Sequence, residues 1–245
     1  MSNSYARFQK DKWFGKTLPH PDWVKEAIEN SSDILTYYES ATPLKEVVVG
    51  NGSNWKIILN PSPIAKFLPK VLQWLDDNNT VVWYWTISQP TDKSTEHIEE
   101  LEFLEPDIRY SFNIHSDIGM QAEELELWDK SIESDKDPFA KISLNLPLDT
   151  NDGFDSIKVY SYGTPSARQR SFNDYIEIGV EHGFFHMNDV KLEYEETNAK
   201  NLPVLLNVCQ PHAFHISTNS LRRRIILRLK TKGTKREDPW HLLEN

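Results

Sequence analysis

Apolar and polar residues alternate between residues 108 and 117, a pattern that predicts a β-strand with one buried face. The polar side of this strand ends in His115 and Asp117, and Gly119 follows as a turn residue. Side chains two residues apart on a strand point the same way, so this imidazole and this carboxylate can reach one metal ion. The alternation therefore indicates a candidate metal site at the end of a strand.

The His-x-Asp/Glu spacing occurs three times in the chain, and its setting distinguishes the three. His20 and Asp22 flank a proline at an expected helix start, where Asp22 suits a cap or the first turn. His97 and Glu99 fall in a Glu-rich stretch typical of a solvated helical face. Only the pair of His115 and Asp117 lies at the end of a predicted strand.

The first hundred residues mix helical and strand patterns. Apolar spacing predicts helices over 21–30 and 64–75, and β-branched or aromatic runs predict strands over 45–49, 55–59 and 80–88. In the last of these strands we expect Trp83 and Trp85 to share a face and to pack in the core.

From residue 106 onward, short strand-like runs dominate, with turn residues between them. Such a series without intervening helices favours a mainly β fold, namely a sandwich, jelly roll or barrel. We expect one integrated domain in which an N-terminal α/β part, 1–105, packs on a β core, 106–232, followed by a tail, 233–245. The predicted strands of the core are 108–115, 140–148, 156–162, 174–180, 190–195, 203–210, 213–217 and 221–230.

Composition and charge narrow the choice of partners. The 245 residues have a net charge of −10, which argues against a broad surface for nucleic acid or anionic membranes. The single Cys209 cannot form an internal disulfide. Because neither a signal peptide nor a long apolar run is visible, we expect a soluble, cytoplasmic protein without a membrane span.

A second candidate constellation lies near the end of the chain. An apolar strand runs into Pro211 and His212, and a last strand then carries Arg222, Arg224 and Arg228 on one face. Arginine within a closed β fold is costly unless an anion pairs with it. A small dicarboxylate would suit such a guanidinium.

Taken in order, His115, Asp117, Pro211-His212 and Arg224 resemble the motifs of the iron(II)- and 2-oxoglutarate-dependent oxygenases. The narrower resemblance is to the aspartyl/asparaginyl-hydroxylase-like and phage-type small members. Two further segments, AKISLNLPL at 140–148 and RIILRLK at 224–230, are similar to strands of that family. The resemblance spans 108–230 and does not include the first hundred residues.

The resemblance implies a double-stranded β-helix, which is a jelly-roll or cupin-like fold. It also implies that Fe(II) binds at His115, Asp117 and His212, and that Arg224 holds the remote carboxylate of the cosubstrate 2-oxoglutarate. Asn145 would be a second cosubstrate contact, whereas Ile226 stands where many relatives have Ser or Thr. The implied activity is hydroxylation of a C–H bond, with a peptide, an amino-acid side chain or another small molecule as the primary substrate.

Other interpretations remain open from the residues. His215 competes with His212 as the third ligand. The chain could instead be a non-enzymatic jelly-roll binding module with a vestigial site, or a cupin-type metal enzyme that does not use 2-oxoglutarate. His182 and His186 have a zinc spacing but lie in a predicted loop. The Arg222–Arg224 run suits a nucleic-acid patch, which the acidic net charge disfavours.

Overall fold

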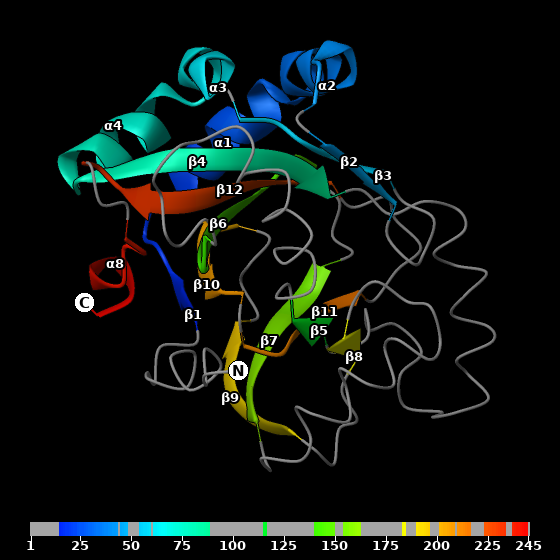
Figure 1. The fold of residues 1–245 in the computed structure, drawn as a ribbon, viewed down its shortest axis with the longest axis vertical. Coiled ribbons are helices and arrows are strands. Elements are labelled where there is room, and N and C mark those ends of the chain that lie inside the picture. Colours follow the sequence, from blue (N-terminus) through cyan, green and yellow to red (C-terminus); the bar gives the residue numbers. More distant parts are fainter. Residues whose placement is uncertain are drawn as a thin grey trace, which may run out of the picture.

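The fold comes from a computed structural model, which describes part of the chain. The described residues are 15–43, 45–48, 54–59, 61–88, 115–116, 140–149, 154–162, 183–184, 190–196, 201–208, 210–216, 223–233 and 237–244. They form two five-stranded antiparallel sheets, a separate two-stranded hairpin and several helices (Figure 1). The mainly β class predicted from the sequence is thereby confirmed.

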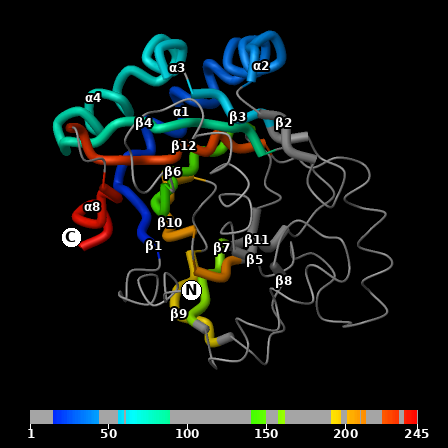
Figure 2. Tube along the Cα trace, viewed as in Figure 1, coloured from blue at the N-terminus to red at the C-terminus, as the bar shows by residue number. Residues whose placement is uncertain are grey.

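The first sheet has the strand order β1-β10-β6-β12-β4. It draws on both ends of the chain, as the colours of Figure 2 make clear, because its edge strands β1 and β4 come from the first hundred residues. Its strands are β1 (Gly15–Thr17), β10 (Val204–Asn207), β6 (Ile142–Pro147), β12 (Arg224–Thr231) and β4 (Thr80–Ser88).

The second sheet has the order β8-β5-β11-β7-β9 and lies below the first in Figure 1. Its strands are β8 (Gly183–Phe184), β5 (His115–Ser116), β11 (His212–Ile216), β7 (Phe154–Tyr162) and β9 (Val190–Glu196). The two-stranded hairpin pairs β2 (Lys45–Val48) with β3 (Asn54–Ile57). The predicted strand 174–180 lies outside the described residues, as do 108–114.

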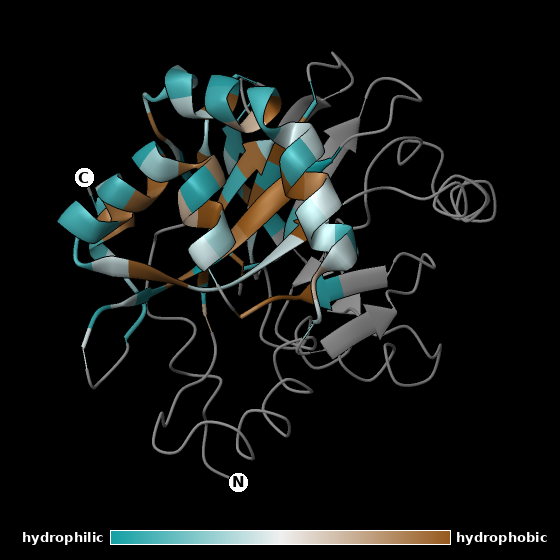
Figure 3. Cartoon of the chain, turned by 90° about the horizontal axis from the view of Figure 1, so that it is seen from above, coloured by the Kyte–Doolittle hydropathy of each residue, from teal (hydrophilic) through white to brown (hydrophobic). Residues whose placement is uncertain are grey.

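The helices cover the face of the first sheet that points away from the second sheet (Figure 1). Their outer sides are hydrophilic and their apolar residues turn toward the sheet (Figure 3). Each large side chain buried at such a contact stabilises the fold by about 1.5–3 kcal/mol. The helices are α1 (Pro21–Glu29), α2 (Ser31–Ser40), α3 (Ser62–Phe67), α4 (Pro69–Asp77) and, apart from these, the short α8 (His241–Glu244).

Alternation along β12 explains how this sheet is layered. Ile225, Leu227 and Leu229 are fully buried in the large core under the helices. Arg224 and Arg228 occupy the alternate positions, so they belong to the opposite face, on the side of the second sheet. A single strand thus separates an apolar helix-covered core from an inner face that carries buried cations.

The predicted helix over 64–75 is wrong in one respect, because the structure has two helices there. The break falls at Leu68, whose φ of −132° and ψ of 54° are not helical. Pro69 explains it, since proline lacks an N–H and disfavours the helical conformation of the residue before it. Pro69 instead begins α4, a position that suits proline.

The expected shared face of Trp83 and Trp85 is also wrong. Opposite β12, Tyr84 pairs with Arg228 and Val82 pairs with Leu229, so Trp83 is an extra residue at a bulge. An extra residue at a bulge shifts the inward and outward alternation of side chains along β4, so Trp83 and Trp85 need not share a face. Both indoles are buried as expected, but Trp85 joins the large core and Trp83 joins a separate cluster.

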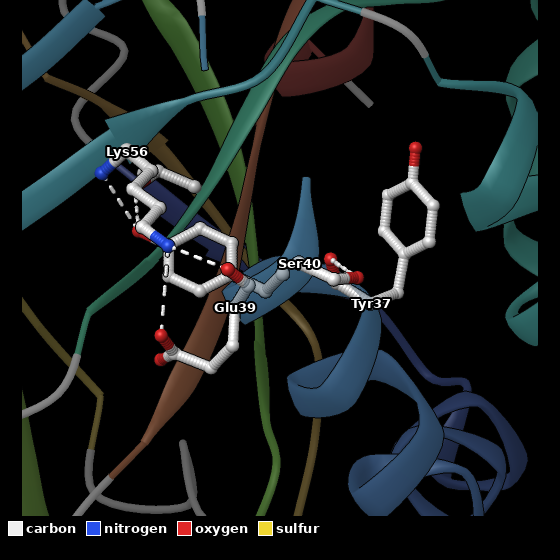
Figure 4. Close-up of polar contacts among 6 residues, drawn as sticks. Tyr37, Glu39, Ser40 and Lys56 are labelled. Carbon is white, nitrogen blue, oxygen red and sulfur yellow. Dashed lines mark hydrogen bonds and ion pairs between the residues drawn. The ribbon is translucent and has the colours of Figure 1, made fainter. Parts of the chain in front are cut away.

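A tyrosine of α2 fastens the β2–β3 hairpin to the first sheet. The Tyr38 hydroxyl accepts the Lys56 backbone N–H at 2.8 Å and lies 3.2 Å from the Thr86 hydroxyl in β4. Lys56 Nζ donates to the Glu39 carbonyl at 2.9 Å and pairs with the Glu39 carboxylate at 3.5 Å (Figure 4). The hairpin therefore has a fixed attachment to the edge of β4.

None of the helices among the described residues has the length and apolarity needed to span a bilayer.

Candidate metal and cosubstrate site

Two of the predicted metal ligands are cross-strand partners on neighbouring strands. His115 begins β5 and His212 begins β11, and the antiparallel register pairs these two residues directly. Directly opposite positions of an antiparallel pair share one face of the sheet. Two residues almost a hundred positions apart in the chain are thus brought to one point of the second sheet.

The His212 ring is held by the chain segment just before it. Its side chain is buried, and Nδ1 lies 2.9 Å from the Gln210 carbonyl oxygen. The Pro211 carbonyl accepts the Tyr160 N–H of β7 at 2.7 Å, which anchors the same segment to the sheet. An imidazole that donates Nδ1–H to a carbonyl keeps its lone pair on Nε2, the tautomer that many metal-ligating histidines adopt.

The competing residue His215 occupies a different register position. It pairs with Ser156 of β7, and it is three residues beyond His212 on the same strand. Residues an odd number apart on a strand belong to opposite faces. The regular part of β11 therefore assigns His212, and not His215, to the face on which His115 has its position.

The third predicted ligand, Asp117, lies outside the described residues. Within the part of the chain that the structure describes, no three His, Cys, Asp or Glu side chains gather closely enough to hold a metal ion. Also outside the described residues are the possible zinc pair, His182 and His186, and Cys209.

Arg224 is the first residue of β12 and is 3% exposed. It pairs with Pro147 of β6 on one side and with Ser88 of β4 on the other. Burial lowers the pKa of Arg224 to about 9, because desolvation disfavours the charged guanidinium. The side chain is still a cation at neutral pH, and its setting favours contact with an anion.

Asn145 is buried on the same inner face, opposite Ile226 of β12. Its Nδ2 donates to the Ser143 hydroxyl at 2.9 Å and lies 3.5 Å from the Val204 carbonyl. Both N–H groups of the amide thus point at protein acceptors. As a donor to a cosubstrate carboxylate, Asn145 would have to give up one of these contacts.

Sequence reasoning missed two carboxylates that the structure pairs with cations near this face. Asp149 binds Arg223, the residue before Arg224. Asp238 lies between Lys141 and Lys230, with each ammonium nitrogen 3.2 Å from one of its oxygens. Neither pair follows a local spacing rule, since Asp149 and Arg223 are 74 positions apart, so no sequence motif pointed to them.

Comparison with known proteins gives only distant structural likeness. No protein-family model matches the sequence, and no curated protein matches it. Among solved structures, EctD from S. alaskensis with 2-oxoglutarate and 5-hydroxyectoine is 14% identical, with a TM-score of 0.43 over 100% of this chain and 84% of that one. AviO1 from Streptomyces viridochromogenes is 10% identical, with a TM-score of 0.41 over 95% of this chain and 96% of that one.

A third similar structure is HygX from Streptomyces hygroscopicus with nickel and 2-oxoglutarate bound. It is 10% identical, with a TM-score of 0.38 over 94% of this chain and 87% of that one. At these values the likeness identifies neither the fold nor the activity of this chain.

Proposed function

We propose that this protein is an Fe(II)- and 2-oxoglutarate-dependent oxygenase of the cytoplasm that hydroxylates a C–H bond. His115, Asp117 and His212 are the proposed iron ligands, and Arg224 is the proposed partner of the distal carboxylate of 2-oxoglutarate. The observation that carries the proposal is the direct cross-strand pairing of His115 with His212. Two histidine positions on one face of the sheet and a carboxylate residue two positions after the first would supply the donor set preferred by non-haem Fe(II).

We further propose that the two sheets are the two walls of a double-stranded β-helix. The order in which the chain visits them supports this. β4 is in the first sheet, β5 in the second, β6 in the first and β7 in the second, and the alternation resumes from β10 to β12. Strands that cross between two antiparallel sheets in this way are typical of jelly rolls. Residues 1–105 then act as an N-terminal part integrated with the β core.

The residues that line the inner face have distinct proposed tasks. The contact with the Gln210 carbonyl orients the His212 ring, and Nε2 is its proposed ligand atom. Arg224 offers a planar fork that suits a carboxylate in a bidentate pair. Asn145 is proposed as a second cosubstrate contact, and Ile226 adds an apolar neighbour in place of a hydroxyl group. An iron ion held by two histidines and one carboxylate retains open positions for a 2-oxo acid and for dioxygen.

The primary substrate is proposed to be a peptide, an amino-acid side chain or another small molecule.

Iron binding by matched histidine variants tests the proposed ligands. The protein kept under anaerobic conditions should bind about one Fe(II) per chain, as expected for a single three-residue site. His115→Ala, Asp117→Ala and His212→Ala should each abolish tight binding, whereas His215→Ala should bind like the parent. Iron binding that survives in His212→Ala but is lost in His215→Ala would reassign the third ligand.

Turnover of 2-oxoglutarate separates this proposal from the other two functions. Conversion to succinate that requires Fe(II) supports the oxygenase. Iron binding without conversion supports a metal enzyme of another type, and the absence of both supports a non-enzymatic binding module.

A further inference from the structure

Arg224 stands at the end of the first sheet, where strands tend to fray. Its two cross-strand partners, Pro147 and Ser88, are the last residues of β6 and β4. A buried side chain that must meet a ligand at fixed geometry needs a rigid backbone, so the contacts of the residue just before Arg224 are important.

Arg223, the residue just before Arg224, is hydrogen-bonded to the two residues that follow β6. The Asp149 carboxylate accepts the Arg223 backbone N–H at 2.7 Å, Arg223 Nε at 3.1 and 3.2 Å, and Nη2 at 2.5 Å. The Arg223 carbonyl accepts the Leu148 N–H at 2.9 Å. Both the main chain and the side chain of Arg223 are therefore tied to residues 148–149.

The two adjacent arginines have different surroundings. Strand alternation assigns Arg224 to the inner face, whereas Arg223 precedes β12 and directs its guanidinium to the Asp149 carboxylate. The Arg223 and Asp149 side chains are 34% and 13% exposed, so the pair lies at the rim of the sheet, where water screens it only in part. Hydrogen bonding to Asp149 raises the pKa of Arg223, which is consistent with a charged two-pronged contact.

We propose that Asp149 is a positioning residue that, by clamping Arg223, fixes the start of β12 and so the direction in which Arg224 presents its guanidinium to the cosubstrate. The inference rests on the proposed function, because it takes Arg224 as the 2-oxoglutarate arginine. Asp149 contacts Arg223, and its proposed effect on the ligand is indirect. Its effect on cosubstrate binding is transmitted through one peptide unit.

The first test is the affinity for 2-oxoglutarate, titrated into the anaerobic Fe(II) protein. Asp149→Ala and Arg223→Ala should each weaken 2-oxoglutarate by roughly tenfold, a size typical of coupling between neighbouring residues, and should leave Fe(II) affinity unchanged. The double variant should be no weaker than either single variant, because both remove the same clamp. Asp149→Asn, which keeps an acceptor for the Arg223 N–H but loses the charge, should be intermediate.

The control is Ile142→Val, a buried change in the same strand β6 that does not touch the clamp. It should lower the melting temperature without weakening 2-oxoglutarate. If it weakens 2-oxoglutarate as much as Asp149→Ala for the same loss of melting temperature, Asp149 is only structural and the inference is overturned. Unchanged 2-oxoglutarate affinity in both clamp variants overturns it as well.

A second readout needs no cosubstrate. Hydrogen exchange of the backbone amides from Arg224 to Leu227 should be faster in Asp149→Ala than in the parent, whereas exchange in the middle of β6 should not change. Equal exchange at Arg224 refutes the clamp even if the parent binds 2-oxoglutarate. A parent protein that does not bind 2-oxoglutarate refutes the proposed function and the role given to Arg224. If hydrogen exchange is nevertheless faster in Asp149→Ala, Asp149 determines only the geometry of the strand.

Discussion

Removing the negative charge of Asp238 should destabilise the fold strongly, because this carboxylate lies between two ammonium groups. Its side chain is 4% exposed, that of Lys230 is 1% exposed and that of Lys141 is 12% exposed. Asp238 contacts Lys230 Nζ and Lys141 Nζ at 3.2 Å each, and it accepts the Lys141 backbone N–H at 2.9 Å. Asp238→Asn keeps the shape but turns an amide N–H or a neutral oxygen toward each cation.

Breaking a buried ion pair by neutralising one partner costs about 3–5 kcal/mol, since the remaining charge is buried without compensation. Two cations share Asp238, so we expect Asp238→Asn to fall in this range. Lys230→Met should cost less, because Asp238 keeps its two contacts with Lys141. The double variant should cost less than the sum of the single variants, as for residues in one network.

The assay is urea unfolding at neutral pH, followed by tryptophan fluorescence. Asp22→Asn is the matched control, since Asp22 pairs with Lys70 at 3.3 Å but both side chains are more than half exposed. This exposed pair should contribute little, and the midpoint should not move. A loss below about 1 kcal/mol for Asp238→Asn, or strictly additive effects with Lys230→Met, would refute the reasoning.

Three further predictions concern single residues. Burial lowers the pKa of Arg224 to about 9, and only the charged guanidinium pairs with the carboxylate of 2-oxoglutarate. The affinity for 2-oxoglutarate should therefore be constant near neutral pH and fall as the pH rises through about 9. An affinity that stays constant up to about pH 10 would contradict this. Tyr38→Phe removes the acceptor of the Lys56 N–H and should cost about 1–3 kcal/mol in urea unfolding, whereas Tyr37→Phe should cost less, and equal losses would argue against the proposed attachment. Gly15→Ala puts a Cβ 2.8 Å from the Tyr194 ring and should cost about 1–3 kcal/mol, and an unchanged midpoint would mean that the ring moves aside freely.

Strand patterns could be predicted where one face of a sheet is apolar. β4, β6 and β12 appear within a few residues of the expected runs because alternation and β-branched residues act locally. The interruption at Leu68 was also visible in the sequence as Pro69, and apolar spacing on both sides of it concealed the break. Helix α2 was not foreseen, because it has few strong helix formers and depends on packing of Ile34 and Tyr38.

In the candidate site, too, some features could be predicted from the sequence and others could not. His115, His212 and Arg224 could be chosen as candidates from the sequence, because their order and spacing resemble the motifs of a known family. The pairing of His115 with His212 depends on how β5 and β11 meet, which no local pattern specifies. The clamp between Asp149 and Arg223 and the ion pair between Lys141 and Asp238 require the folded sheet, since each joins distant segments.

The most direct test of the account is a titration of 2-oxoglutarate into the anaerobic Fe(II) protein, followed by the visible charge-transfer absorption that arises when a 2-oxo acid chelates iron. The parent should develop this band with saturation near one equivalent per chain. His212→Ala should give no band, and Arg224→Met should require a higher concentration, corresponding to about 2–5 kcal/mol of lost binding. A parent that binds Fe(II) but develops no band at any 2-oxoglutarate concentration, or a His212→Ala variant that develops the full band, would contradict the account.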